Sequence, residues 1–360
     1  MSMRSAAVLL ALVLVLLTGG PAQAKTKQDR VIKDSRITES SGLAPSLLHK
    51  NVLWTHNDSG HSAQIYGIAK NGSTAATVVI SGEQSRDWEA ITSLRGPKNS
   101  PAPGEALIAV GDIGDNLAVH PSVRIAIIRE PQNLADVTVE PVRVLNLTYP
   151  DGPRDAEALL ADPKSGQLYV VSKTLFGSEL YSVPKKVWPG NQATGESKVT
   201  EMTKVATMRA PMVTDGAFLP DGNLLLRGYG NLSVIAAPST VENERLETLA
   251  SKSLPKQEQG ESLAVVDDGA YALIGSEGEN SPILRVRIPE VATEEAEPSS
   301  ASPTPTSVSS KAAEQLRELA GSDTRLQLIV GSGAAVVALI VLIAAAIMLR
   351  PNRSRRRRRR

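Results

Sequence analysis

The sequence predicts an all-β domain built as a five-bladed β-propeller, and three observations lead to that prediction. Between residue 25 and about residue 291, short apolar runs alternate with Gly, Pro, Asn and Asp, and no stretch shows the period of a long amphipathic helix. A lead motif recurs five times in this region, at intervals expected of an internal repeat. Each lead opens a unit of short apolar strands, and four strands repeated around an axis make a propeller.

The first two strands of each unit follow directly from its lead. Each lead has a small or acidic start, a short apolar strand, a turn and a second apolar strand, and the turns "PKSG", "PDG" and "DDG" suit hairpins. In chain order the leads are "ESSGLAPSLLHKNVLWTHNDSG" from Glu39, "DWEAITSL" from Asp87 with "EALIAVGDIGDN" after an insertion, "DAEALLADPKSGQLYVVSKT" from Asp155, "TDGAFLPDGNLLLRGYG" from Thr214 and "GESLAVVDDGAYALIGSEGEN" from Gly260.

The third and fourth strands complete the units, with one exception. The third strands are "AQIYGIAKNG", "VRIAIIREP", "SELYSVPKK", "LSVIAAPST" and "PILRVRIPE", and the fourth are "AATVVIS", "VRVLNLTY", "KVATMRAP" and "LETLASKSLP". The last unit has no fourth strand of its own. The stretch "RVIKDSRI", residues 30–37, precedes the first lead and is the candidate to fill that place. An N-terminal strand would then close the ring and protect its edges.

Two other architectures compete with five blades. A six-bladed propeller would need a blade hidden in the long second unit, which carries insertions at Gly96–Glu105 and Gln132–Val139. A β-sandwich also has many short strands, but it does not predict a fixed lead motif. Five blades account for the repeats most simply.

The ends of the chain predict an exported, membrane-anchored protein. Residues 1–24 read as a secretory signal peptide, with one Arg, a short apolar run and "AQA" before the cleavage site. The propeller ectodomain would occupy 25–292, and a stalk rich in Pro, Ser, Thr and Glu would occupy 293–327. Residues 328–349 carry no charge and suffice for one transmembrane helix. The polybasic tail at 350–360 would stay cytoplasmic and contact anionic lipids, so the ectodomain would lie outside the cell membrane.

Charge and cysteine content narrow the function classes. The formal net charge is +1, to which Arg4 contributes one and the tail eight positive charges, so residues 25–349 carry −8. An acidic ectodomain argues against a nucleic-acid partner and is compatible with hard cations. The sequence has no cysteine, which excludes thiol catalysis and cysteine–zinc sites.

Aligning the five leads predicts a ring of polar residues on the propeller axis. One column reads Ser41, Glu89, Glu157, Gly216 and Glu261, and the residue two positions later in each lead is apolar. Because the innermost strands line the central channel, this column becomes a ring in which three carboxylates repel one another or recruit a cation. Oxygen ligands favour Ca²⁺, with Mg²⁺ second, and the ring has no His or Cys for zinc. Salt bridges and hydrogen bonds between blades are the alternative role for these glutamates.

The loops after the second strands predict a funnel at the mouth of the channel. They read "THNDSG", "GDIGDN", "SKTLFG", "RGYGNL" and "GSEGEN". Ordinary turn chemistry explains any one of these polar residues, but together they form a candidate ligand site. The candidates are His56, Asn57, Asp58, Asp112, Asp115, Asn116, Lys173, Arg227 and Glu277.

Two families resemble these motifs. The leads "SSGL", "WEAI", "AEAL", "DGAF" and "GESL" resemble the apyrase family of calcium-activated nucleotidases. That resemblance implies a five-bladed propeller with an axial Ca²⁺, held here by Ser41, Glu89, Glu157 and Glu261, while Gly216 breaks the pattern. The words "HNDSG", "DWEAI", "GDIGDN" and "PRDAEALL" are similar, more closely, to exported, membrane-anchored propeller repeat proteins of actinobacteria, and that resemblance implies no activity.

Two functions therefore remain open. The first is a membrane-tethered binding module whose partner is an envelope protein or a small phosphate-bearing ligand. The second is a calcium-dependent phosphohydrolase, nucleotidase-like or phytase-like, which needs basic residues near the funnel to hold phosphates. The candidates for that role are Arg86, Arg124, Arg154, Lys173 and Arg227.

Overall fold

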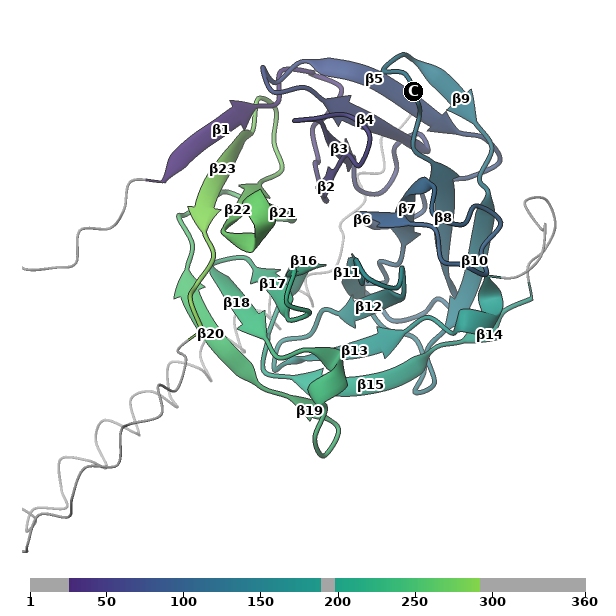
Figure 1. Cartoon of the computed structure of the whole chain (residues 1–360), viewed down its shortest axis with the longest axis vertical. Coiled ribbons are helices and arrows are strands. Elements are labelled where there is room, and N and C mark those ends of the chain that lie inside the picture. Colours follow the sequence, from purple (N-terminus) through teal and green to yellow (C-terminus); the bar gives the residue numbers. More distant parts are fainter. Residues whose placement is uncertain (1–25, 189–197, 292–360) are drawn as a thin grey trace, which may run out of the picture. The chain divides into compact units, whose positions relative to one another are not determined.

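Five antiparallel sheets surround a central axis in the computed structural model, which describes residues 26–188 and 198–291 (Figure 1). The prediction of an all-β, five-bladed propeller is confirmed. The predicted signal peptide, the stalk, the transmembrane helix and the basic tail lie outside the described residues. Within those residues, no helix is both long enough and apolar enough to cross a membrane.

Each blade consists of four strands that run from the axis to the periphery. Blade 1 is β2 (Ala44–Pro45), β3 (Leu53–His56), β4 (Gln64–Ile68) and β5 (Thr74–Ile80); blade 2 is β6 (Trp88–Arg95), β7 (Ala106–Asp112), β8 (Val123–Arg129) and β10 (Arg143–Thr148). Blade 3 is β11 (Ala156–Ala161), β12 (Leu168–Ser172), β13 (Ser178–Ser182) and β15 (Thr203–Met208). Blade 4 is β16 (Val213–Phe218), β17 (Leu224–Gly228), β18 (Asn231–Ile235) and β20 (Thr248–Ser253); blade 5 is β21 (Ser262–Val266), β22 (Tyr271–Gly275), β23 (Pro282–Arg287) and β1.

The N-terminal strand closes the ring, three residues earlier than the sequence suggested. Strand β1 (Lys27–Val31) pairs antiparallel with β23, from Lys27 opposite Arg285 to Val31 opposite Pro282. It overlaps the predicted stretch 30–37 only at its first two residues. The rest of that stretch leaves the sheet and crosses to blade 1, where the N–H of Lys33 donates to the Gly72 carbonyl at 3.0 Å. The ring is therefore sealed by pairing in blade 5 and by contacts to blade 1.

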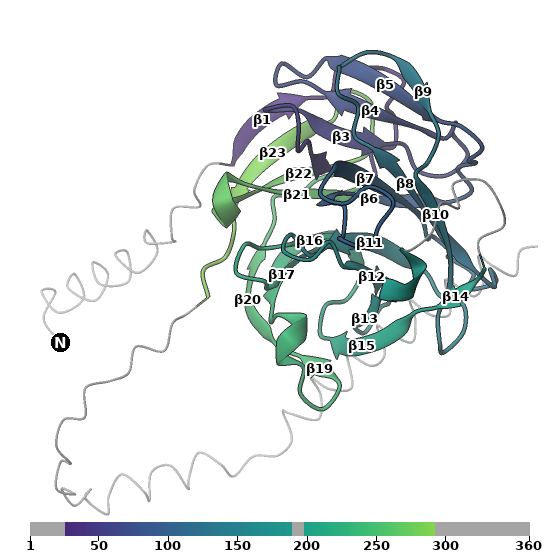
Figure 2. The same cartoon turned by 45° about the vertical axis from the view of Figure 1, so that its right-hand side comes forward.

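Three short strands join neighbouring blades at the periphery (Figure 2). They are β9 (Val137–Val139) on β5, β14 (Thr200–Glu201) on β10 and β19 (Arg245–Leu246) on β15, and all three pairings are parallel. Each comes from the connection between the third and fourth strands of the next blade. The second insertion of blade 2 thus contains β9, while the first only links β6 to β7, so neither hides a sixth blade.

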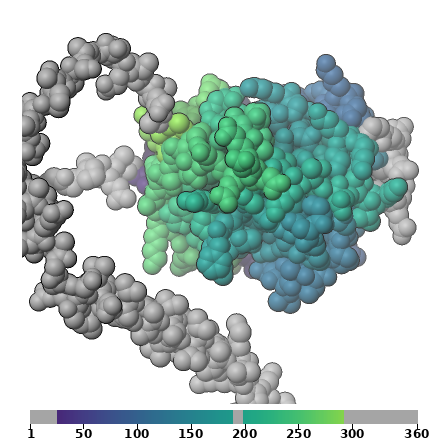
Figure 3. All heavy atoms as spheres, turned by 90° about the horizontal axis from the view of Figure 1, so that it is seen from below, coloured from purple at the N-terminus to yellow at the C-terminus, as the bar shows by residue number. Residues whose placement is uncertain are grey.

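The hydrophobic core lies between adjacent sheets rather than at the axis. The largest cluster is formed by buried residues of blades 2 and 3, such as Ile125, Leu145, Leu159 and Trp188. Figure 3 shows the outer wall, where side chains of blade 3 in teal adjoin those of blade 4 in green. Because apolar packing between neighbours holds the blades, the inner ends of the strands are free to carry polar side chains.

Candidate functional site

A bulge in the innermost strand places the glutamates of the ring. In β6 the register against β7 shifts between Trp88 and Ala90, and in β11 it shifts against β12 between Ala156 and Ala158. Glu89 and Glu157 are the extra residues at these bulges. A bulge leaves one residue outside the ladder and re-aims its side chain. The two side chains are turned out of the regular strand pattern in the same way in both blades.

The counterpart of these glutamates in blade 4 is Thr214, not Gly216 as the alignment of leads predicted. The register of β16 against β17 shifts between Val213 and Asp215, which makes Thr214 the extra residue. The Thr214 hydroxyl donates to the Gly260 carbonyl of blade 5 at 3.1 Å. The alignment failed because it was anchored on the apolar Phe218, whereas strand register depends on the partner strand.

The five positions are buried and differ in their chemistry. Ser41, Glu89, Glu157 and Glu261 are between 2% and 5% exposed, and Thr214 is 0% exposed. The Ser41 hydroxyl donates to Glu89 Oε2 at 3.3 Å, so the positions of blades 1 and 2 are in contact. The ring therefore offers three carboxylates and two hydroxyls, one group from each blade.

Three carboxylates converge beside the ring in a way that no single lead predicts. Oxygens of Asp58, Asp87 and Glu89 lie within 4.8 Å of one another. Burial and the neighbouring acids Asp58 and Asp155 raise the pKa of Asp87 to about 6. Burial, then the charge of Glu157 and the acids nearby, also raise the pKa of Glu89 well above its ordinary value. We call Asp58, Asp87 and Glu89 the acidic throat.

Lys173 neutralises the other side of the ring. Its ammonium pairs with the Glu157 carboxylate and donates to the Tyr229 hydroxyl at 3.0 Å. The side chains of Lys173 and Glu157 are only 12% and 5% exposed. Burial lowers the pKa of Lys173, but the Glu157 carboxylate raises it further, so the net shift is upward. The protein thus supplies its own cation to Glu157, while the acidic throat has none at hydrogen-bond distance among the described residues.

Two carboxylate oxygens of the ring point to a missing ligand. Glu157 Oε2 and Glu261 Oε2 are buried, and neither has a hydrogen-bond partner within residues 26–188 and 198–291. Buried carboxylate oxygens are costly unless a donor or a cation faces them. Together with the throat, they form an all-oxygen set that fits Ca²⁺, which takes six to eight such ligands at flexible positions.

The funnel candidates divide into two groups. Asp58, Lys173 and Glu277 lie at the throat, and burial with Glu261 and Asp58 nearby raises the pKa of Glu277 to about 7. Asn116 is exposed on the loop after β7. These four are accessible to a ligand at the mouth of the channel.

The remaining five funnel candidates are structural. The buried His56 ring donates through Nδ1 to the Asn57 carbonyl at 2.8 Å and contacts the Trp88 ring, and burial lowers its pKa to about 4. The Asn57 amide oxygen accepts from the N–H groups of Thr38 and Glu39, both at 3.1 Å.

Asp112, Asp115 and Arg227 also serve the backbone. The carboxylate of Asp112 accepts from the N–H of Asp87, and that of Asp115 accepts from the N–H groups of Val119 and His120. The Arg227 guanidinium is 0% exposed and donates to two carbonyls of blade 5. Turn chemistry and blade-to-blade bonds account for all three side chains.

The basic residues considered for phosphate binding do not converge on the funnel. Arg124 pairs with Glu83 at 3.0 Å, and Arg154 pairs with Asp151 at 2.6 Å and with Glu179. Arg86 lies 3.6 Å from Asp112. Lys173 alone of the five faces the ring.

An apolar rim surrounds the acidic throat, and sequence reasoning missed it. Leu117 and Val119 are 82% and 62% exposed, and Leu175 and Phe176 are 68% and 97% exposed. Both loops are anchored on Asp155: its carboxylate accepts from the N–H of Asp115 at 2.9 Å, and its carbonyl from the N–H of Lys173 at 3.0 Å. The rim therefore consists of two neighbouring loops, in blades 2 and 3. Apolar letters between polar turn residues were its only signal in the sequence.

Comparisons with known proteins support the fold alone. No family model matches the chain, and no curated protein matches it. A glucose dehydrogenase-type oxidoreductase from Thermus thermophilus has 13% identity and a TM-score of 0.38 over 72% of this chain and 99% of its own. A luciferin-regenerating enzyme has 10% identity and a TM-score of 0.37 over 71% and 94%, and the Dos1 propeller has 11% identity and a TM-score of 0.35 over 68% and 58%. At such values these similarities carry no argument about activity.

Proposed function

We propose that the protein is a single-pass, membrane-anchored, extracytoplasmic binding module that takes its ligand at the funnel mouth, with Ca²⁺ bound in the acidic throat. The observation that carries the proposal is the pairing of a buried acidic throat with an exposed apolar rim. Monomeric proteins seldom expose large apolar groups together without an interaction partner. An enzyme that handles phosphate would need cations where this site has carboxylates.

Asp58, Asp87 and Glu89 are the residues that would hold the cation, with the Ser41 hydroxyl beside them. Carboxylate and hydroxyl oxygens from two blades suit Ca²⁺ better than Mg²⁺, which demands a tighter octahedral set. A bound cation would keep Glu89 ionised despite its burial, because an opposite charge offsets the cost of desolvation. It would also fix the loops that carry the rim relative to the throat.

The partner would be a protein of the cell envelope that presents apolar side chains. Leu117 and Phe176 are the most exposed members of the rim, and aromatic or large aliphatic groups at such positions act as interface anchors. The signal peptide, stalk and apolar span expected at the chain ends support a location on the outer side of the membrane.

Thermal melting of the full chain in a non-ionic detergent tests the cation. Ca²⁺ at about 100 times its Kd should add roughly 2.7 kcal/mol to the free energy of unfolding, and Mg²⁺ should add less. Asp87→Asn and Glu89→Gln should lose the effect. Glu105→Gln, which alters a carboxylate that is 45% exposed and paired with Arg129, should keep it. No melting shift with either cation would sink the cation claim.

A phosphate-release assay separates binding from catalysis. The binding module should release no phosphate from nucleotides, with or without Ca²⁺. Ca²⁺-dependent release that disappears in Glu157→Gln would instead assign a phosphohydrolase, because that change removes a ring carboxylate and leaves the rim untouched.

A further inference from the structure

A lysine-lined cavity lies at the opposite end of the strands from the funnel. It has a volume of about 340 Å³ and lies where the β6–β7 and β11–β12 turns meet the 3₁₀ turn η1 (Lys185–Val187). The funnel loops follow β7 and β12, whereas these turns precede them, so the two sites are at opposite ends of the same antiparallel strands. The cavity is separate from the acidic throat.

The charge of the cavity is unbalanced. Lys98, Lys164 and Lys185 line it, and its lining includes no acidic side chain. None of the three ammonium groups forms an ion pair with an acid in the part of the chain that the structure describes. Residues 25–349 are acidic overall, so three unpaired lysines in one cavity are unexpected from composition. Like charges that converge in this way favour an anion between them.

The positions of these lysines are fixed by contacts between two blades. Gly166 adopts φ +70°, and a Cβ there would lie 2.7 Å from the Arg95 carbonyl oxygen and 2.9 Å from Pro97 Cγ. The β11–β12 turn is therefore packed tightly against the start of the β6–β7 connection. Across the cavity, Asn99 Nδ2 donates to the Lys185 carbonyl at 3.2 Å. The ammonium groups thus extend from anchored turns, which lowers the entropy cost of gathering them around a ligand.

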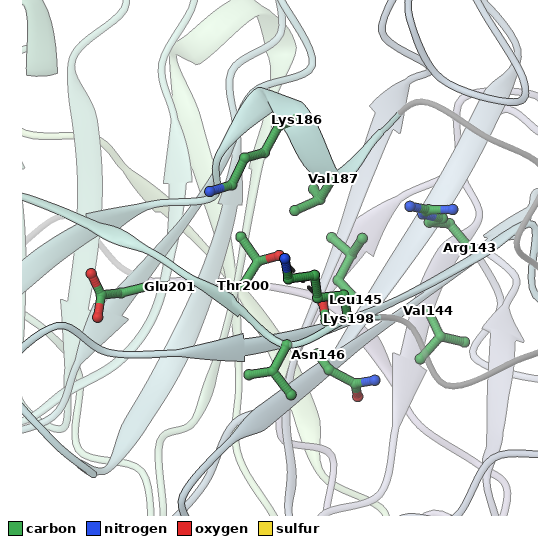
Figure 4. A pocket seen from close by; sticks show the side chains of 10 residues that line it. Arg143, Val144, Leu145, Asn146, Lys186, Val187, Lys198, Thr200 and Glu201 are labelled. Carbon is green, nitrogen blue, oxygen red and sulfur yellow. Dashed lines mark hydrogen bonds between the residues drawn. The ribbon is translucent and has the colours of Figure 1, made fainter.

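The neighbouring cavity provides an internal comparison. It has a volume of about 320 Å³ and takes Lys186 from the same 3₁₀ turn, together with Lys198 (Figure 4). Glu201 also lines that second cavity, so a carboxylate is already present there. Adjacent lysines on one short turn therefore face different electrostatic surroundings.

We propose that the cavity of Lys98, Lys164 and Lys185 binds the phosphoryl group of a small organic phosphate. A phosphate dianion can accept hydrogen bonds from all three ammonium groups at once. The buried Trp188 lines the same cavity and provides an apolar wall for the organic part. A volume of about 340 Å³ is at the small end of the range for small-molecule sites. This site does not depend on the function proposed for the funnel.

Titration of the full chain in a non-ionic detergent with inorganic pyrophosphate tests the site. Calorimetry should show saturable binding that weakens as NaCl rises, and the fluorescence of Trp188 should change. Lys98→Gln, Lys164→Gln and Lys185→Gln should each weaken binding by about tenfold. Trp188→Phe should remove the fluorescence change but keep the calorimetric signal.

Lys186→Gln is the matched control, because it removes the adjacent lysine of the same turn. It should leave pyrophosphate binding unchanged. Equal losses in Lys185→Gln and Lys186→Gln would overturn the proposal, since binding would then follow net charge alone. Binding to phosphatidylglycerol vesicles without binding to pyrophosphate would overturn it as well, in favour of a lipid headgroup surface.

Discussion

The Asp215 carboxylate accepts a hydrogen bond from the backbone N–H of Leu263, 2.6 Å away, and so joins the innermost strands of blades 4 and 5. Its second oxygen accepts from the N–H of Gly216 at 2.7 Å. The side chain is 1% exposed, and it therefore serves as a fastener between blades.

Removing this fastener should destabilise the fold. Asp215→Ala should lower the free energy of unfolding by about 3 kcal/mol, because two buried N–H groups lose their acceptor. Asp215→Asn should cost roughly half as much, since burial raises the pKa of Asp215 and the amide keeps one acceptor oxygen. Urea unfolding of the variants measures both values. Asp221→Ala, in an exposed turn of the same blade, is the control and should change stability little.

Lys173→Met should be strongly destabilising in the absence of divalent cations. It removes the ammonium that pairs with the buried Glu157 carboxylate and leaves that carboxylate uncompensated, at a cost of about 3 kcal/mol. Added Ca²⁺ should recover part of that loss, because it can replace the missing positive charge. Thermal melts with Ca²⁺ and with chelator check both statements.

The control for Lys173 is Lys204→Met. Lys204 pairs with Asp151 at 3.3 Å near the surface, where its side chain is 34% exposed. Such pairs contribute less than about 1 kcal/mol, so this variant should melt close to the wild type. An equal loss in both variants would contradict a special role for Lys173.

A methyl group added at Gly114 should block the acidic throat. Its Cβ would lie 2.8 Å from Glu89 Cγ and would also collide with Asp87 Oδ2, so the two carboxylates could not keep their positions. Gly114→Ala should therefore abolish the stabilisation by Ca²⁺ in a thermal melt. Gly230→Ala provides the comparison, because a Cβ there meets nothing within 4 Å, and the Ca²⁺ effect should persist.

The ring closure should carry a pH-dependent contribution. The hydrogen-bonded Arg36 guanidinium holds the pKa of Asp34 well below its ordinary value of 3.8. The Asp34 carboxylate also accepts from Thr74 Oγ1 at 2.6 Å, which ties the segment after β1 to blade 1. Because the folded pKa is lowered, the stabilisation is present above pH 3.8 and is lost as the pH falls below that value.

Arg36→Gln tests this contribution. It should lower the free energy of unfolding by about 1 kcal/mol at neutral pH, and the difference from the wild type should shrink in acid. Denaturant unfolding at several pH values measures the difference. Arg129→Gln removes an ion pair whose side chains are 54% and 45% exposed, and it should show little effect at any pH. A difference for Arg36→Gln that stays constant into acid would contradict the assignment.

The candidate site could be read only in part from the leads. Glu89 and Glu157 could be placed together because both follow a similar word in the same register. Thr214 could not be recognised as their counterpart, since its bulge depends on how β16 pairs with β17. Asp87 looked like a turn residue, and only the approach of the loop after β3 brings Asp58 to it. Arg227 looked accessible, yet it is enclosed between blades 4 and 5.

The five blades and their closure by an N-terminal strand could be predicted without coordinates. They follow from local signals, because strand period, turn residues and a repeated lead are each contained within one unit of the chain. Which lead residue faces the axis, which acids meet and which cations are already paired became known from the folded arrangement. Those outcomes depend on strand register and on contacts between blades far apart in sequence, and no local pattern encodes them.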